Sequence, residues 1–218
     1  MSTIQDRYSI SDNPEEMLEE WLRENLYDLH TSSPCVVNAF NSENRTVDVN
    51  VAIKRDFRGI PENLTILRGV PVVYPSGANF DITWPIEIGD TGLITFCESS
   101  IDRWLTSEGL KIVNPLDTRM HDYSDGVFIA GLQTYSNASP VDEDSACFRY
   151  NDSKIKMSKN GNIEISNDSG SITLDENGKL CVNASGVDLL SVMINAIEKA
   201  DTTGAAMLDI QSLRTAVC

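Results

Sequence analysis

The sequence predicts a mainly β protein with helical segments near both ends, and three patterns carry that prediction. Between residues 35 and 130, short runs of alternating apolar and polar residues are separated by Asn, Asp, Pro and Gly. Residues 154–186 form four units of eight or nine residues, each a short alternating strand that closes on a glycine. Apolar residues recur at helical spacing in residues 14–30 and again after residue 186.

The first segment, residues 1–33, is predicted to contain one amphipathic helix. Asn13 is a good N-cap, Pro14 suits the first helical position, and Glu16 completes a pattern like a capping box. The apolar stripe that follows consists of Met17, Leu18, Trp21, Leu22, Leu26 and Leu29. The opposite face is acidic, which opposes adsorption to a membrane, so we expect the stripe to pack on the next domain or to dock on another protein.

Residues 34–133 are predicted to form a domain of short strands. Alternation predicts strands at 35–40, 46–53, 69–74, 79–84, 91–97 and 127–130, and residues 100–105 have the pattern of a short helical turn. Short strands in this number are typical of a small barrel or sandwich. The polar, irregular composition of residues 134–152 predicts a linker.

The repeat region, residues 153–186, is predicted to be a narrow sheet with one apolar face and with turns closed by glycines. The turn glycines are Gly161, Gly170, Gly178 and Gly186, and the apolar face consists of Ile155, Met157, Ile163, Ile165, Ile172, Leu174, Leu180 and Val182. So thin a sheet cannot bury its own apolar side, and a second surface has to cover it. The candidates are the strand-rich domain of the same chain and identical sheets of neighbouring chains in an intertwined trimeric prism. The fixed short period favours the prism.

Residues 187–218 return to helical spacing. The predicted packing residues of this C-terminal helical segment are Leu190, Met193, Ile194 and Ile197, and a second helical pattern covers residues 205–217. Two roles are open for the segment: a three-stranded bundle that closes the rod, or the seat of a separate tip protein.

Charge and composition narrow the possible functions. The net charge of −16 opposes binding to nucleic acid and to anionic lipid surfaces, and no run of 18 apolar residues predicts a transmembrane helix. The N-terminus also lacks the pattern of a secretory signal. The groups that invite a catalytic or metal-binding interpretation are His121-Asp122, Glu15-Glu16, Glu19-Glu20 and Asp142-Glu143-Asp144. Each lacks the partner residues that its chemistry needs, so we predict no enzyme activity, no metal site and no cofactor.

Three stretches within residues 34–133 are long and distinctive. They are DVNVAIKR (48–55), GVPVVYPSGANFDITWPIEIGDTGLITFCESSIDRWL (69–105) and DTRMHDYSDGVFIAGL (117–132). Together they resemble the oligosaccharide/oligonucleotide-binding (OB) fold N-terminal domain of phage membrane-piercing spike proteins. Those proteins form the central spike of contractile-tail baseplates.

The resemblance implies a structural homotrimer: OB-fold domains, then a C-terminal β-helical rod that pierces the host cell envelope when the sheath contracts. It implies a virion protein of the tail baseplate, made in the host cytoplasm, with a hub protein above it and transient contact with the host membrane. Such spikes often end in a His-x-His motif that binds iron, whereas His30 and His121 are the only histidines here and neither lies in the repeats. We therefore expect a blunt rod capped by a separate tip protein or by its own helices. The alternatives are a non-catalytic OB-fold module that binds glycan or nucleic acid, and an envelope-degrading enzyme.

Overall fold

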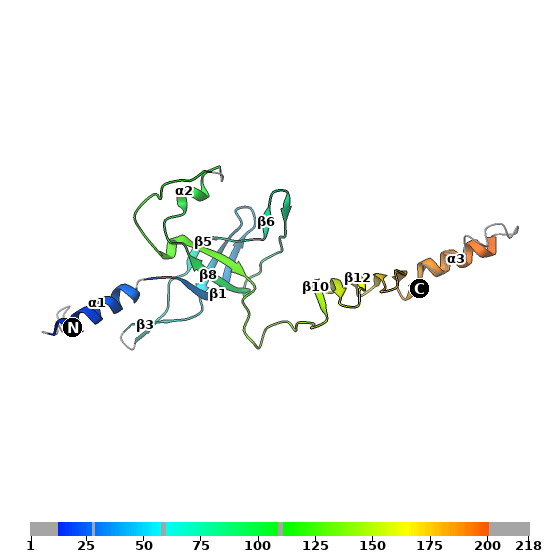
Figure 1. The fold of residues 1–218 in the computed structure, drawn as a ribbon, viewed down its shortest axis with the longest axis horizontal. Coiled ribbons are helices and arrows are strands. Elements are labelled where there is room, and N and C mark those ends of the chain that lie inside the picture. The colour runs from blue at the N-terminus through cyan, green and yellow to red at the C-terminus, as the bar shows by residue number, and fades with distance from the viewer. Residues whose placement is uncertain (1–12, 28, 58–59, 109–110, 201–218) are drawn as a thin grey trace. The chain divides into compact units, whose positions relative to one another are not determined.

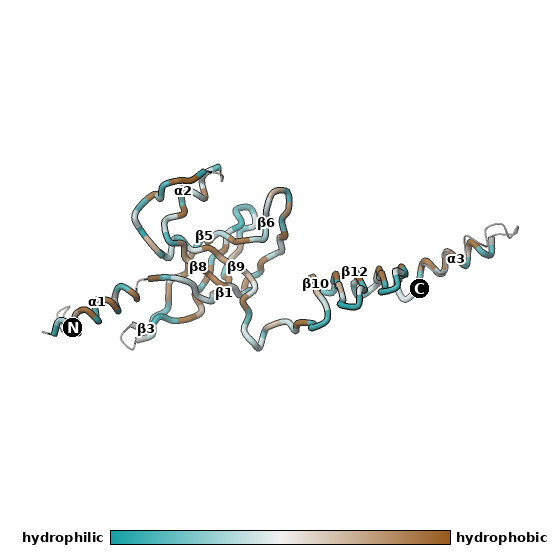
Figure 2. Tube along the Cα trace, viewed as in Figure 1, coloured by the Kyte–Doolittle hydropathy of each residue, from teal (hydrophilic) through white to brown (hydrophobic). Residues whose placement is uncertain are grey.

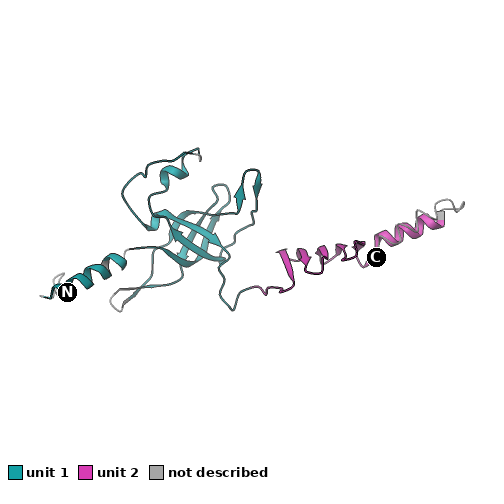
Figure 3. Cartoon of the chain, viewed as in Figure 1, with its two compact units in different colours: residues 1–138 teal, residues 139–218 magenta. Residues whose placement is uncertain are grey.

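The computed structural model describes residues 13–27, 29–57, 60–108 and 111–200 of the 218-residue chain. The chain divides into two compact units, residues 1–138 (unit 1) and 139–218 (unit 2), shown in Figure 3. The helical pattern predicted for residues 205–217 lies outside the described residues. Among the helices that are described, none combines the length and the apolar character that crossing a membrane requires.

Unit 1 begins with helix α1 (Pro14–Tyr27), which follows the predicted capping pattern at Asn13. The Asn13 side chain accepts a hydrogen bond from the Glu15 backbone N–H at 3.1 Å, and its carbonyl accepts one from Met17 at 3.1 Å. Five residues of the apolar stripe are at least half exposed: Met17, Leu18, Trp21, Leu22 and Leu26. These five side chains are therefore largely uncovered, while Leu26 and Leu29, at the end of the stripe, line a pocket with Val51 and Phe96 of the strand-rich domain.

The centre of unit 1 is a strongly curled five-stranded sheet. Its strands are β1 (Ser32–Asn41), β2 (Thr46–Val51), β5 (Leu67–Pro71), β8 (Thr91–Phe96) and β9 (Gly126–Ala130), in the order β5-β2-β1-β8-β9 (Figure 1). The sheet curls until its two edges meet at a parallel bridge between Val72 and Phe128, where the Val73 N–H donates to the Phe128 carbonyl at 2.9 Å. This is an OB-like half-barrel, in agreement with the predicted mainly β class.

The connections of the half-barrel hold short elements that periodicity predicted less well. They are β3 (Arg55–Phe57), β4 (Ile60–Glu62), β6 (Ser76–Gly77), β7 (Phe80–Asp81), α2 (Asp102–Leu105) and η2 (Tyr123–Asp125). The strand predicted at 79–84 is only two residues long in the structure, and the hairpin of β3 and β4 was not predicted. Both differences lie in connections, where few side chains are buried and alternation carries little information.

The core of unit 1 lies inside the curled sheet. Its buried apolar residues are Cys35, Val37, Val47, Val49, Val70, Tyr74, Ile86, Ile94, Phe96 and Phe128. Close packing requires a glycine at Gly92, because a Cβ there would lie 2.4 Å from the Phe128 ring. Burial raises the pKa of the Cys35 thiol to about 11, so this thiol is uncharged at neutral pH.

A buried carboxylate fastens the long connection between β8 and β9 to the half-barrel. Asp125 is fully buried and accepts two hydrogen bonds from the Arg119 guanidinium, at 2.6 Å from Nε and 2.8 Å from Nη2. Arg119 also reaches Asp102 at 2.5 Å and Asp117 at 2.8 Å, and the Ile101 N–H donates to Asp125 at 3.0 Å. The hydrogen bonds from Arg119 lower the pKa of Asp125.

Unit 2 is a six-stranded antiparallel meander followed by a helix. The strands are β10 (Ser145–Tyr150), β11 (Ser153–Ser158), β12 (Ile163–Asn167), β13 (Gly170–Leu174), β14 (Leu180–Ala184) and β15 (Val187–Asp188), and each pairs with the next in sequence. The helix is α3 (Leu189–Ala200). Strand β10 lies inside the stretch predicted as a linker. The prediction missed this strand because the acidic residues and serines around it obscure its alternation.

The described backbone hydrogen bonds of the ladder join neighbouring strands of the same chain in antiparallel pairs. Strands β10 and β15 form the two edges of this sheet. The expectation that copies of the chain intertwine stays a prediction.

Three of the four predicted turn glycines occupy the left-handed region that favours glycine. Gly161, Gly178 and Gly186 have φ of 96°, 79° and 80°. Gly170 instead opens strand β13, where an added Cβ would lie 2.6 Å from the Asn183 carbonyl oxygen. The turn before it is built by Asn167, whose side chain accepts from the N–H groups of Ser169 and Gly170 at 2.9 and 3.0 Å.

Candidate assembly surface

The apolar face of the ladder consists of two parallel columns of side chains that cross the strands. Directly opposed residues in the strand register form Phe148-Ile155-Ile165-Ile172-Val182 as one column and Ala146-Met157-Ile163-Leu174-Leu180 as the other. All eight residues predicted from alternation lie in these columns. The structure adds Ala146 and Phe148 on β10, which alternation within SACFRY would have revealed had the stretch not been assigned as a linker.

This face is largely uncovered in the single chain. Seven of the eight predicted residues are between 39% and 50% exposed, and Val182 is half-buried. Among the described residues of unit 2, the one buried apolar side chain is Ile194. A sheet of five-residue strands without a core of its own needs a second surface to be stable in water.

The opposite face of the ladder is polar and carries ion pairs and hydrogen bonds within the chain. Lys154 pairs with Glu164 at 3.2 Å, and the Ser166 hydroxyl donates to Glu164 at 2.7 Å. These contacts lower the pKa of Glu164, the Ser166 hydrogen bond most of all. Figure 2 shows the resulting separation, with brown on one side of the unit 2 strands and teal on the other. The two faces therefore differ: the polar face is in part paired within the chain, and the apolar face is largely uncovered.

The acidic run 142–144, expected to be solvated linker, contributes to that polar face. Asp142 pairs with Lys156 at 2.8 Å, and Asp144 with Lys159 at 2.7 Å. The Lys156 ammonium holds the pKa of Asp142 well below its usual range. Two of the three acids therefore neutralise lysines of the ladder.

The four residues predicted to pack on the C-terminal helix differ in burial. Ile194 is 5% exposed and Leu190 is half-buried, since both lie on the side of α3 that contacts β14 and β15. Met193 is 59% exposed and Ile197 43% exposed. The helix thus uses part of its apolar surface within the chain and leaves part uncovered.

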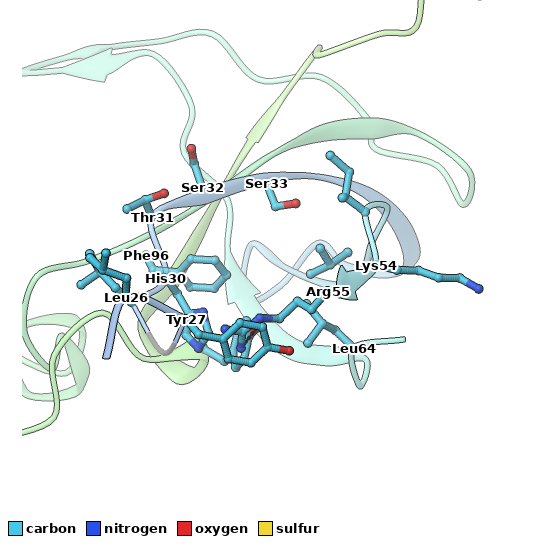
Figure 4. A pocket seen from close by; sticks show the side chains of 14 residues that line it. Leu26, Tyr27, His30, Thr31, Ser32, Ser33, Lys54, Arg55, Leu64 and Phe96 are labelled. Atoms are coloured by element: carbon cyan, nitrogen blue, oxygen red, sulfur yellow. Dashed lines mark hydrogen bonds between the residues drawn. The ribbon is translucent and has the colours of Figure 1, made fainter. Parts of the chain in front are cut away.

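Unit 1 contains a cavity of about 380 Å³ at the C-terminal end of α1, shown in Figure 4. The His30 ring stacks on Tyr123 with centroids 3.6 Å apart, and the Arg55 guanidinium lies 3.6 Å from the centre of the Tyr27 ring. Arg55 also donates to the Tyr123 hydroxyl at 3.1 Å, while Lys54 extends away from the rings (Figure 4). The cationic group of Arg55 is thus engaged by two tyrosines of its own chain.

The residues that invited a catalytic interpretation lie at a backbone corner, at the cap of η2 and on the exposed surface of α1. His121 occupies a corner with φ of 50°, and Asp122 caps η2 by accepting from the Ser124 N–H at 2.8 Å. The side chains of Glu15, Glu16 and Glu19 are exposed on α1. Within the described part of the chain, no three His, Cys, Asp or Glu side chains are grouped so that they could hold a metal ion.

Comparison with known proteins relates the half-barrel to a domain of a phage protein. No curated protein matches the chain. A family model does match: it covers residues 33–131, which is just under half of the sequence and extends from the second residue of β1 to the residue after β9. The OB-like half-barrel of this chain therefore matches the domain described as the phage protein Gp138 N-terminal domain.

Proposed function

We propose that this chain is a structural central spike protein of a contractile phage tail baseplate. In this role, three copies form a rod that pierces the host cell envelope when the sheath contracts and that links the hub above to a tip protein. The observation that carries the proposal is that two features occur together in one chain. A half-barrel that matches a phage domain is followed by a ladder whose apolar face is largely uncovered.

Assembly through the ladder follows from the physics of its two faces. Each strand contributes two apolar side chains, so the face is two columns wide and runs the full height of the sheet. Identical sheets have identical heights and periods, so copies of this chain fit one another without gaps. Three copies make a closed prism and two make a sandwich; the resemblance to trimeric spikes favours three.

The mechanical role is derived from the same arrangement. Each sheet keeps its backbone hydrogen bonds within its own chain, and the apolar columns of all copies share one interior. Removing one chain would expose the apolar columns of the others, so we expect the assembly to unfold as a unit and slowly. Slow unfolding suits a part that is driven through an envelope under load.

The function is tested by locating the chain in phage particles. Gold-labelled antibodies against unit 1 are expected to mark the distal end of the tail, at the centre of the baseplate, in electron micrographs of purified particles. Particles whose tails lack the chain would contradict the proposal. Hydrolysis of peptidoglycan by the purified chain, or tight binding of single-stranded DNA at physiological salt, would replace it with one of the two alternatives.

A further inference from the structure

Helix α3 is apolar over more of its circumference than its own chain covers. At 3.6 residues per turn, the polar residues of the helix lie on one side, because Asn195 follows Ser191 by four residues and is itself followed by Glu198 and Lys199 after three and four. The apolar residues occupy roughly the other half of the helix. A helix with so wide an apolar surface is typical of buried positions.

The apolar surface of α3 has an inner and an outer part. The inner part, Leu190 and Ile194, faces β14 and β15 of the same chain. The outer part, which we name the outer stripe, consists of Leu189, Val192, Met193 and Ile197, all between 42% and 59% exposed. Packing on the ladder accounts for the inner part alone, so the outer stripe needs a second partner.

The outer stripe continues the apolar face of the ladder. Val187 lies directly opposite Ala184 in the strand register, which puts it on the same face as Leu180 and Val182. Val187 is 47% exposed, and Leu189, the first residue of the outer stripe, follows two positions later. Whatever covers the ladder face therefore reaches the start of α3.

Charge separates α3 from the other uncovered helix of the chain. Helix α1 carries Glu15 and Glu16 in its first turn and Glu19 and Glu20 in its second, so copies of α1 brought together would oppose like charges. Helix α3 has no acidic residue in its first turn, and its two charges, Glu198 and Lys199, have opposite signs. Of the two helices, α3 is the one whose surface fits copies of itself.

We infer that the outer stripe of α3 binds the outer stripes of the other copies, so that the helices form a bundle that continues the ladder interface. This inference rests on the proposed assembly through the ladder and assigns the C-terminal helix to that assembly, not to the seat of a tip protein. Residues at the axis of such a bundle are shielded from water, whereas the side of Asn195 stays outside.

The test introduces a cysteine into the full-length chain at one of two positions. With Met193→Cys, a short bis-maleimide is expected to join chains into covalent oligomers on a denaturing gel, beyond the level given by the natural cysteines of the parent chain. The control is Asn195→Cys, on the far side of the helix, which should stay at the parent level. A Met193→Cys chain that is assembled but remains at the parent level would overturn the inference.

A second pair of variants measures how much the outer stripe contributes to the thermal stability of the assembly. Met193→Glu should lower the melting temperature of the assembly by on the order of 10 °C, because a carboxylate would be buried in every copy. The control is Leu22→Glu, which also replaces an apolar residue by Glu at a similarly exposed position of α1 and should leave melting unchanged. If Met193→Glu destabilises without cross-linking at Met193→Cys, the cover comes from the same chain or a different protein, and the inference fails. A monomeric parent chain would instead refute the proposed function.

Discussion

The two units of this chain differ in whether the apolar face of their strands is covered within the unit. Both are built from short antiparallel strands with one apolar face. In unit 1 the sheet curls until β5 meets β9 and encloses ten buried apolar residues, counted over the described part of the chain. In unit 2 the sheet does not close on itself, and its two apolar columns stay exposed. A sheet that closes makes its own core, and a sheet that stays open depends on a partner.

The largest effect is expected from a charge in the open face. Ile165 lies between Ile155 and Ile172 at the middle of one column. Ile165→Glu should abolish assembly at micromolar concentration, because each copy would add an unpaired carboxylate to the shared interior. Sedimentation of the purified variant measures this. Ser171→Glu, on the polar face of the same sheet, is the control and should assemble like the parent; equal behaviour of the two variants would mean that the apolar face is not the interface.

A substitution that creates a cavity in the core of the closed sheet should destabilise unit 1 and leave the assembly intact. Phe128 is fully buried, so Phe128→Ala is expected to destabilise the half-barrel by about 3–5 kcal/mol. Urea unfolding followed by tryptophan fluorescence reports on this unit, because Trp21, Trp84 and Trp104 all belong to it. Loss of assembly by this variant would show that the two units do not fold independently.

The Arg119–Asp125 pair makes the stability of unit 1 depend on pH. Because the folded-state pKa of Asp125 is lowered, its contribution is complete above the unfolded value of about 4 and is lost as the pH falls through the folded pKa. Asp125→Asn should therefore lose about 2–3 kcal/mol at pH 7 and depend less on pH between 5 and 2 than the parent. Asp117→Asn, at the exposed partner of Arg119, is the control with an effect below about 1 kcal/mol. An unchanged acid profile in Asp125→Asn would contradict this role of the pair.

The smallest effect concerns the turns of the ladder. Gly161 has φ of 96° and open space around its Cα, so Gly161→Ala should cost about 1 kcal/mol from backbone strain alone. Gly170→Ala should cost more, because its Cβ would meet the Asn183 carbonyl oxygen in the neighbouring strand. Thermal melting of the two variants compares them, and the reverse order would show that the β13–β14 contact is looser than the structure has it.

The ladder was predictable from sequence because period-two alternation assigns each side chain to a face whatever the partner is. That is why Ile155 to Val182 lie in the columns as expected, and why Phe148, in a stretch dominated by polar residues, was missed. The closure of the half-barrel at Val72 and Phe128 and the burial of Asp125 beneath Arg119 depend on contacts between distant segments. Alternation carries no information about such contacts, so by itself it fits a barrel and a sandwich equally well.

The most direct test of the account is the mass of the intact chain in solution, measured by light scattering over a dilution series. Three copies of a 24.1 kDa chain should be found at every concentration at which the ladder is folded. A chain that remains monomeric while folded would contradict the assembly of the open sheet, and a stable dimer would replace the trimeric prism with a two-sheet sandwich.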